Sequence, residues 1–348
     1  MKTWIWLAVV AVLWTGYGCE LKKSAIGEES EVVVVADSTL FATIQPVLKE
    51  ALERTILTPQ PEKIFTLKYM PPNQLGRAVV RHFILMAGTL DGQDKTSKQV
   101  RAMLSEKLLE QVKNSQSFVF RKQEPWAENQ LLLVLVAPDS ASLKARIAEN
   151  QDYLFNILQE ENFRRTEKEM FSQLEQKDLE QKLLEKYGWT LRIQHDYIIY
   201  REDEKNNFVM LRRTSPERWL FVYWIESDNP EIVTKEWIFQ TRNWIGRKYY
   251  ENDRVLDSLY QVHESKIGDR WVLEVDGLWE NEEKVAGGPW KAFAFYDDAT
   301  KRAYLIDIAV FAPGMRKEPF LRQLEVMARS FRTAADLKAE AAKTKANE

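Results

Sequence analysis

The sequence predicts an α+β protein with two α/β domains, the second an antiparallel sheet sandwiched by helices. First, the chain has 348 residues, more than one hydrophobic core usually serves. Second, eight of the nine tryptophans beyond residue 18 fall between Trp189 and Trp290, so the halves differ in composition. Third, the first half alternates strand and helix patterns, whereas the second half presents successive strands, a helix, more strands and a last helix.

The N-terminus predicts a lipoprotein signal peptide over residues 1–18. Lys2 precedes an apolar run from Trp4 to Trp14, which is shorter than the about 20 residues that a membrane-spanning helix needs. Small residues then lead to Cys19, the only cysteine. This pattern resembles the lipobox of bacterial lipoproteins, in which the cysteine is acylated and becomes the first mature residue. Gly18 fits that motif, whereas Gly16 stands where Leu is usual. Ordinary secretion with an incidental cysteine is the alternative.

An acylated Cys19 predicts a protein of the cell envelope that is attached to a membrane by lipid. Lys22 and Lys23 favour the outer membrane, facing the periplasm, over export to the surface. With Cys19 acylated, no cysteine remains for a disulfide, a thiolate nucleophile or a zinc–thiolate site. The net charge of −3 argues against nucleic acid as a partner.

Residues 19–30 are polar and aperiodic, and they predict a tether. Residues 31–160 predict the N-terminal α/β domain. The run of β-branched residues from Glu31 to Ala36 indicates a strand covered on both faces, and Asp37 or Ser38 caps a helix that contains Pro46. Further strands are expected at 63–70, 82–87, 118–120 and 131–136, and helices at 74–80, 96–112 and from 140 onward.

Residues 161–187 are dense in charge with few apolar positions. They predict a solvated helical connector rather than a partner-binding helix, because a sparse apolar stripe buries too little for a strong interface. Residues 333–348 are rich in Ala, Lys and Glu without an apolar stripe, which predicts a disordered tail.

Residues 188–332 predict the C-terminal antiparallel α+β domain. A helix begins at Pro230, and a closing helix has the apolar positions Leu321, Leu324, Val326, Met327 and Phe331. Strands are expected at 189–193, 197–201, 207–213, 218–225, 270–278, 290–296 and 302–311.

The most suggestive stretch for ligand binding runs from Glu274 to Trp290. Strand alternation places Glu274 and Asp276 on one face and Trp279 on the other, and a Gly-Gly-Pro loop then allows close backbone approach. The alternative is a hairpin with one solvated acidic face and one packed aromatic face. The candidate ligand-binding residues are Glu274, Asp276, Trp279, Glu280, Gly287, Gly288 and Trp290.

Other chemistry finds little support in the residues. His82, His195 and His263 each lack a second histidine at ligand spacing, so no metal site is predicted. Asp91 to Asp94 lacks the length of a calcium loop. Neither a phosphate-binding Gly-Lys-Ser/Thr loop nor a Gly-x-Ser-x-Gly elbow occurs, and we expect no cofactor and no catalytic residues.

Several short motifs resemble an uncharacterised lipoprotein family of the Bacteroidota, the domain of unknown function 4837. They are Glu31–Val35 with Asp37-Ser38, Pro59–Glu62, Phe65–Leu67, Pro125–Ala127, Gln130, Ala137-Pro138, Asp276–Trp279, Gly287–Pro289 and Ala312–Gly314. The resemblance implies localisation and fold but no activity. The second half is also similar to PsbP-like domains, whose last helix ends in a Ser-Phe pair, here Ser330-Phe331. Those domains are mostly binding or assembly factors.

Two functions follow as hypotheses. The first is a lipid-anchored, non-catalytic binding or assembly module of the cell envelope. Its partners would be the membrane, through acylated Cys19, and an envelope protein or glycan. The second is an envelope glycan or peptide hydrolase that uses Glu274, Asp276 or Glu280, because paired carboxylates about 5 to 10 Å apart can hydrolyse glycosides.

Overall fold

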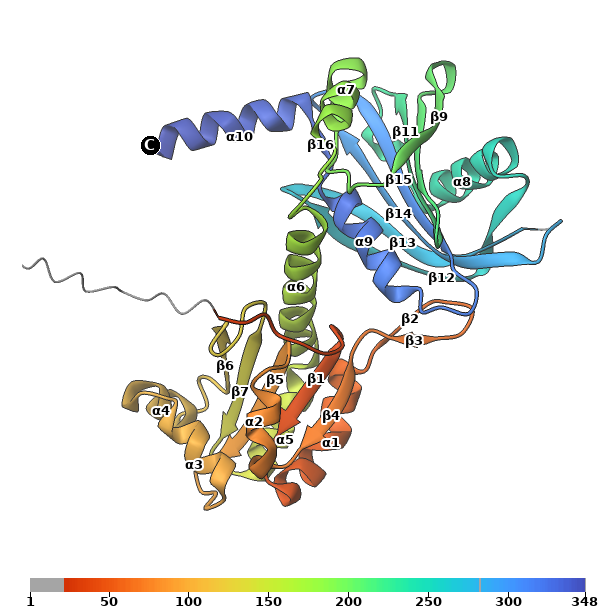
Figure 1. Cartoon of the computed structure of the whole chain (residues 1–348). Helices are drawn as coiled ribbons and strands as arrows, with labels where there is room; N and C mark the ends of the chain where they lie inside the picture. The colour runs from red at the N-terminus through yellow and green to blue at the C-terminus, as the bar shows by residue number, and fades with distance from the viewer. Residues whose placement is uncertain (1–21, 282, 348) are drawn as a thin grey trace, which may run out of the picture.

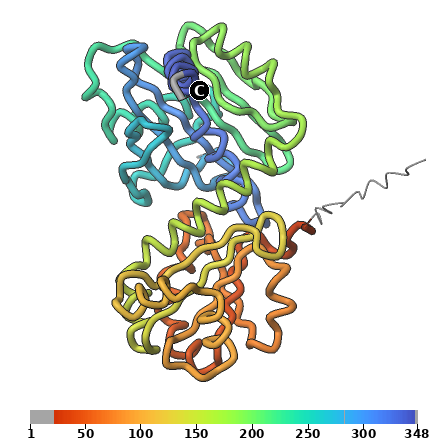
Figure 2. Tube along the Cα trace, turned by 90° about the vertical axis from the view of Figure 1, so that its left-hand side faces the viewer, coloured from red at the N-terminus to blue at the C-terminus, as the bar shows by residue number. Residues whose placement is uncertain are grey.

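The computed structural model describes residues 22–281 and 283–347, which form two lobes joined by helix α6 (Gln151–Met170) (Figures 1 and 2). The predicted signal peptide and Cys19 lie outside the described residues. No helix in the described ranges is long and apolar enough to cross a bilayer. The predicted α+β class is confirmed, with both lobes built from a sheet covered by helices.

The N-terminal lobe is a five-stranded sheet of order β4-β1-β5-β7-β6, parallel except for β6. Helices α1, α5 and α6 cover one face, and α2, α3 and α4 cover the other. Strand β1 shows why its sequence does not alternate: Val32 and Val34 pack on one side, and Val33 and Val35 on the other. The strands are β1 Glu31–Val35, β4 Thr66–Met70, β5 Phe83–Thr89, β6 Val119–Gln123 and β7 Leu131–Ala137.

The helices of this lobe begin at side-chain caps in several places. Asp37 and Asp139 accept backbone N–H groups at the start of α1 and α5. The expected single helix 96–112 is two helices, because Ser105 caps a new start. The helices are α1 Ser38–Leu52, α2 Leu75–Ala78, α3 Lys95–Ala102, α4 Glu106–Lys113 and α5 Ser140–Glu149.

The C-terminal lobe is a seven-stranded antiparallel sheet of order β12-β13-β14-β15-β11-β10-β9. Helix α8 (Lys235–Tyr249) covers one face, and α9 (Glu318–Arg329) with α7 (Lys177–Tyr187) covers the other. A short pair, β8 Trp189–Thr190 and β16 Arg332–Thr333, lies beside the sheet. The strands are β9 Ile198–Asp203, β10 Phe208–Arg213, β11 Glu217–Glu226, β12 Asp253–Ile267, β13 Arg270–Asn281, β14 Ala286–Asp297 and β15 Arg302–Phe311.

The structure differs from the sequence expectation at the Gly-Gly-Pro segment. Gly287 and Gly288 lie inside strand β14, paired with Glu280 and Trp279 of β13, and do not form a loop. A Cβ on Gly288 would lie 2.0 Å from the carbonyl oxygen of Val310. Glycine is needed there because strand β15 approaches too closely for a side chain.

Two further segments differ from expectation. Residues 334–347 form helix α10 (Ala334–Asn347) rather than a disordered tail, since Thr333 and Asp336 hydrogen-bond reciprocally at its start and Ala, Lys and Glu favour helix. The expected connector, residues 161–187, forms the end of α6 and helix α7 and is not simply solvated. Glu161, Asn162 and Arg165 are buried where α6 packs against α9 between the lobes, and Glu180 and Leu183 of α7 are buried.

The expected tether is also different. Ser30 is buried, and Glu29 accepts hydrogen bonds from Arg322 of α9. The backbone of Ile26 donates to the carbonyl of Val80, 2.8 Å away. Residues 22–30 therefore lie along the N-terminal lobe and reach the interface between the lobes.

The lobes dock through the N-terminus of α9. A hairpin of β2 (Thr55–Ile56) and β3 (Glu62–Lys63) reaches across from the N-terminal lobe (Figure 1). The Glu62 carboxylate accepts the backbone N–H of Lys317 at 2.8 Å and of Glu318 at 2.9 Å. Lys317 itself offers no side-chain cap, so one lobe caps a helix of the other.

We expect Glu62→Ala to lower the free energy of unfolding by about 1–2 kcal/mol, because it removes the cap and a negative charge at the helix N-terminus. Denaturant titration of the full chain measures this. Glu50→Ala, an exposed glutamate on α1, is the matched control. Equal stability of the two variants would contradict the capping role.

Candidate functional site

The candidate site is a cavity of about 470 Å³ between the two lobes. The N-terminal lobe and α6 contribute Ile56, Asn156 and Phe163, and the C-terminal lobe contributes strands β12, β13 and β14 and helix α9. This first wall mixes apolar side chains with the polar Arg54, Thr55, Asn156 and Gln159, and the opposite wall carries mainly charged and amide side chains. The polar lining residues of the C-terminal lobe are Gln261, His263, Ser265, Glu274, Asp276, Lys291, Glu325 and Arg329.

An ionic cluster forms the floor of this cavity. The Lys291 ammonium lies 3.1 Å from Glu274, 2.9 Å from Asp276 and 3.0 Å from Glu325. Arg329 contacts Glu274 at 2.8 Å and Glu325 at 2.7 Å. Three carboxylates thus surround two cations that are permanently charged.

His263 supplies the remaining charge when it is protonated. Its Nε2 lies 3.3 Å from Glu274 and 3.5 Å from Asp276. The hydrogen bond to Glu274 raises the pKa of His263, and the neighbouring carboxylates add to that effect against burial. Protonation of His263 balances the third carboxylate, so the cluster is neutral in that state.

The pKa values of the two carboxyl groups on β13, Glu274 and Asp276, are shifted in opposite directions. Burial opposes ionisation of Glu274, but Lys291, the His263 hydrogen bond and Arg329 outweigh it and hold its pKa far below the usual range. Burial raises the pKa of Asp276, with the charge of Glu274 as a further cause. Glu274 is 3% exposed and remains a carboxylate, which excludes it as a proton donor near neutral pH.

His263, Glu274 and Asp276 are also ligand types for a metal ion. One ligand atom from each lies within 4.8 Å of the others, among the described residues. The Lys291 ammonium, however, contacts both carboxylates and provides the cation that they require. A divalent ion would have to lie beside this ammonium, so the geometry assigns the position to Lys291 rather than to a metal.

The structure brings only part of the predicted site together. Glu274 and Asp276 lie in the cavity, on the face opposite Trp279, as strand alternation predicts. Trp290 borders the cavity, while its ring packs against Phe239 on the α8 side.

The other predicted residues lie elsewhere. Trp279 is buried and donates to the carbonyl of Val310. Glu280 pairs with Arg254 at 2.7 Å, and with Gly287 it borders a different, open groove of about 800 Å³. Gly288 is packed against β15. These four residues are not part of the ionic cluster.

Four cluster residues were missed by the sequence reasoning. His263 lies on β12, which no apolar alternation marks, because its exposed edge leaves most side chains in solvent. Lys291 is the only charged residue of β14 before Asp297 at the end of the strand, and this isolated charge was a signal in the sequence. Glu325 and Arg329 stand one helical turn apart on α9, beside the apolar positions that were recognised.

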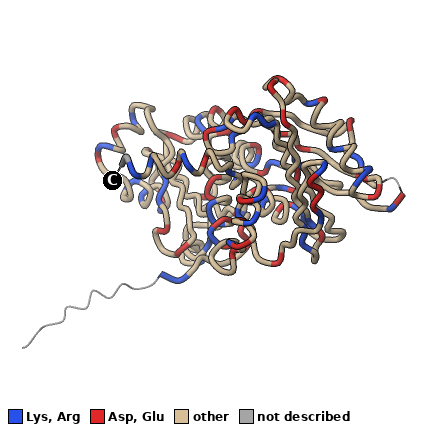
Figure 3. Tube along the Cα trace, turned by 90° about the horizontal axis from the view of Figure 1, so that it is seen from above, with Lys and Arg blue, Asp and Glu red and all other residues tan. Residues whose placement is uncertain are grey.

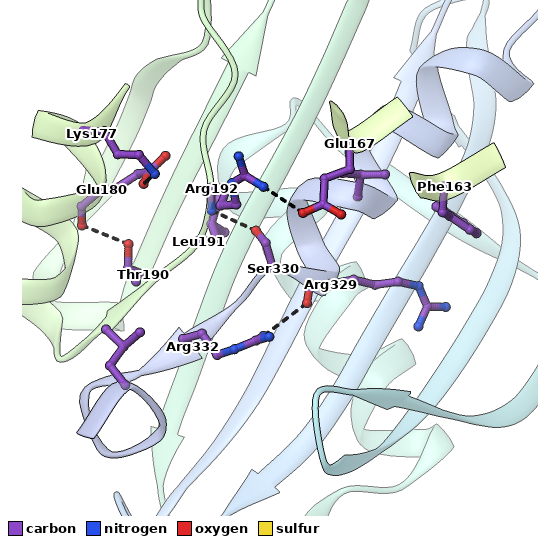
Figure 4. A pocket seen from close by; sticks show the side chains of 12 residues that line it. Phe163, Glu167, Lys177, Glu180, Thr190, Leu191, Arg192, Arg329, Ser330 and Arg332 are labelled. Atoms are coloured by element: carbon purple, nitrogen blue, oxygen red, sulfur yellow. Dashed lines mark hydrogen bonds and ion pairs between the residues drawn. The ribbon is translucent and has the colours of Figure 1, made fainter. Parts of the chain in front are cut away.

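A second cavity of about 500 Å³ lies on the other side of α9 and shares Phe163 and Arg329 with the first (Figure 4). Arg192 contacts Glu167 at 2.7 Å there, and the backbone N–H of Arg192 donates to Ser330 (Figure 4). Outside the cavities, positively and negatively charged residues are interspersed along the chain, so the charge distribution does not indicate a different site (Figure 3). The first cavity therefore remains the better candidate, since it holds the buried cluster.

Comparison with family models divides the chain into the same two parts. Residues 176–330 match the family described as domain of unknown function DUF4837. The C-terminal lobe is therefore similar to the DUF4837 family over these residues. Residues 25–171 match a second family, domain of unknown function DUF8532, so the motifs noted before residue 171 lie outside the DUF4837 match. The ionic cluster lies entirely within the residues that match DUF4837.

Comparison with curated proteins gives no match. A crystal structure from Bacteroides thetaiotaomicron has 8% identity and a TM-score of 0.27, over 42% of this chain and 45% of that chain. The Ran-binding protein Mog1p of Saccharomyces cerevisiae has 12% identity and a TM-score of 0.30, over 42% and 90%. LpqN, described as involved in cell envelope biogenesis of Mycobacterium tuberculosis, has 10% identity and a TM-score of 0.27, over 41% and 81%. Likenesses this low support no conclusion about function.

The cluster predicts a pH dependence of stability. Because the folded pKa of His263 is raised, its contribution is fully present below the unfolded pKa of about 6.5 and is lost as pH rises through the folded value. We expect His263→Gln to destabilise the C-terminal lobe at about pH 6 and to approach the stability of the wild type at about pH 9. Unfolding titrations at both pH values measure this, with Glu264→Gln on the same strand as control. A difference that does not change with pH would contradict the assignment.

Proposed function

We propose that this protein is a lipid-anchored, non-catalytic binding module of the cell envelope that holds a polar ligand between its two domains. The Cys19 motif supports the anchoring, and the cavity between the domains supports the binding role. Both domains contribute to this cavity, so a ligand there would contact both and stabilise their docking.

The observation that carries the binding role is the fixed arrangement of charge opposite a wall of mixed apolar and polar side chains. Lys291 and Arg329 hold the carboxylates of Glu274 and Glu325 in place, so the cluster is organised before any ligand arrives. The amides of Asn156 and Gln261 reach the same cavity from opposite domains. Such a mixture of amides, carboxylate and an aromatic ring suits a ligand with many hydroxyl groups, as in an envelope glycan.

The same arrangement disfavours the hydrolase hypothesis. A glycoside hydrolase needs one protonated carboxyl group as general acid and a second carboxylate that is free to act. Glu274 and Asp276 instead share the Lys291 ammonium, and Glu280 lies outside the cavity with Arg254 as its partner.

Titration calorimetry with oligosaccharides released from the cell envelope tests the binding role. We expect Asn156→Ala and Gln261→Ala each to weaken binding by roughly 5- to 20-fold, because each removes one side-chain hydrogen bond to the ligand. Gln181→Ala, an exposed amide on α7 away from the cavity, is the control and should bind like the wild type. No heat with the wild type, or equal affinity in all four proteins, would contradict a glycan in this cavity.

A further inference from the structure

The chain enters the N-terminal domain very close to the proposed lipid. Lys22 is the first described residue and stands three positions after Cys19. An extended chain spans at most about 3.3–3.6 Å per residue, so the Cα atoms of Cys19 and Lys22 lie within about 11 Å of each other. If Cys19 is acylated, the membrane surface must therefore lie near Lys22.

Residues 22–26 are bound to the domain by hydrogen bonds, so they do not lengthen the link between the domain and Cys19. Lys22 donates from its ammonium to the carbonyl of Glu124 at 2.5 Å, and the backbone N–H of Glu128 donates to Lys23 at 3.0 Å. The N–H of Ala25 donates back to Glu128 at 2.9 Å. A lipid at Cys19 would hold this side of the N-terminal domain against the bilayer.

Three segments form that side of the domain: residues 22–26, 79–81 and 124–130. The buried side chain of Gln130 ties them together, because its amide nitrogen donates to the carbonyls of Val79 and Arg81 and its oxygen accepts from Trp126. Ile26 in turn donates to the carbonyl of Val80. The surface is thus built from fixed backbone rather than from loose loops.

This surface exposes apolar side chains that the fold does not use. Ile26 is 58% exposed, Val80 38% and Trp126 38%. Tryptophan is favoured at the level of lipid headgroups, where its ring contacts acyl chains and its N–H stays hydrated. The three segments carry the cations Lys22, Lys23 and Arg81 against the carboxylates Glu124 and Glu128, a net charge of +1, so the apolar side chains and the anchor rather than charge hold this surface on the bilayer.

We propose that the surface formed by residues 22–26, 79–81 and 124–130 lies on the membrane, with Ile26, Val80 and Trp126 at headgroup depth. This inference rests on the lipid anchor of the proposed function. This side of the domain then stays nearest the bilayer, since a link of three residues spans at most about 11 Å.

Fluorescence quenching in vesicles tests the inference. Acylated Cys19 has no free thiol, so Trp126→Cys and Val80→Cys each provide a single site for the environment-sensitive dye NBD. Met103→Cys and Tyr200→Cys, at exposed positions elsewhere, are the controls. The lipidated full chain is reconstituted in phosphatidylethanolamine–phosphatidylglycerol vesicles that contain spin-labelled lipid. We expect quenching at 126 and 80 to be roughly twofold stronger or more than at the controls.

Radiolabelled palmitate separates this inference from the anchor itself. Incorporation into the wild type but not into Cys19→Ser, with selective quenching at 126 and 80, supports both. Incorporation with equal quenching at all four positions overturns the membrane-facing surface and leaves the anchor intact. Failure to incorporate palmitate overturns the anchor and the inference with it. Burial of the dye at 126 and 80 in unlipidated Cys19→Ser protein without vesicles would mean that a second copy covers this surface, and would also overturn the inference.

Discussion

Helix α9 is the element on which both domains depend. Its apolar side, with Leu321, Leu324 and Met327, completes the core of the C-terminal lobe. Its N-terminus is capped by Glu62 from the other domain, and Arg322 on its first turns contacts Glu29 and Thr166. The cavity between the domains exists because the same helix is held from both sides.

The polar side of α9 then supplies the ionic cluster. Glu325 and Arg329 face β13 and β14, where they meet Glu274 and Lys291. Taking such charges out of water costs several kcal/mol each, and only good geometry offsets this. Apolar residues of similar volume would fill this space without the desolvation cost. The cluster is therefore better explained by a role in the cavity than by stability alone. That reasoning links the docking of the domains to the binding function.

Much of the architecture could be predicted from residue patterns, because burial on one or both faces of a strand determines where apolar residues stand in its sequence. The Val32–Val35 run indicated a central strand, and alternation placed Glu274 and Asp276 together. The exposed strand β12 and the glycines of β14 produce no such pattern. Strand β12 exposes most of its side chains, so His263 looked isolated. Gly287 and Gly288 suggested a loop, since glycine usually marks turns. Here Gly288 is required by the close approach of β15, and a Cβ on Gly287 would lie 2.9 Å from the carbonyl oxygen of Trp279 on β13. Local sequence does not encode such contacts between strands.

The environment of the charged helix α6 also depends on tertiary contacts that its own sequence does not reveal. Its sparse apolar positions suggested a solvated helix, yet Arg165 is buried and donates to the carbonyl of Glu29. Charge can line a domain interface when each group finds a partner there. The tail behaves similarly, because Asp336 pairs with Arg270 at 2.9 Å and fixes the start of α10.

Pulsed electron–electron double resonance measures the docking of the two domains most directly. Spin labels at Met103→Cys and Tyr200→Cys, in a Cys19→Ser background, place one probe on each domain. The account predicts one narrow distance distribution in the otherwise wild-type chain, broadened when Glu62→Ala and Arg322→Ala are added together. A broad or multiple distribution before those substitutions would contradict a preformed cavity between rigidly docked domains.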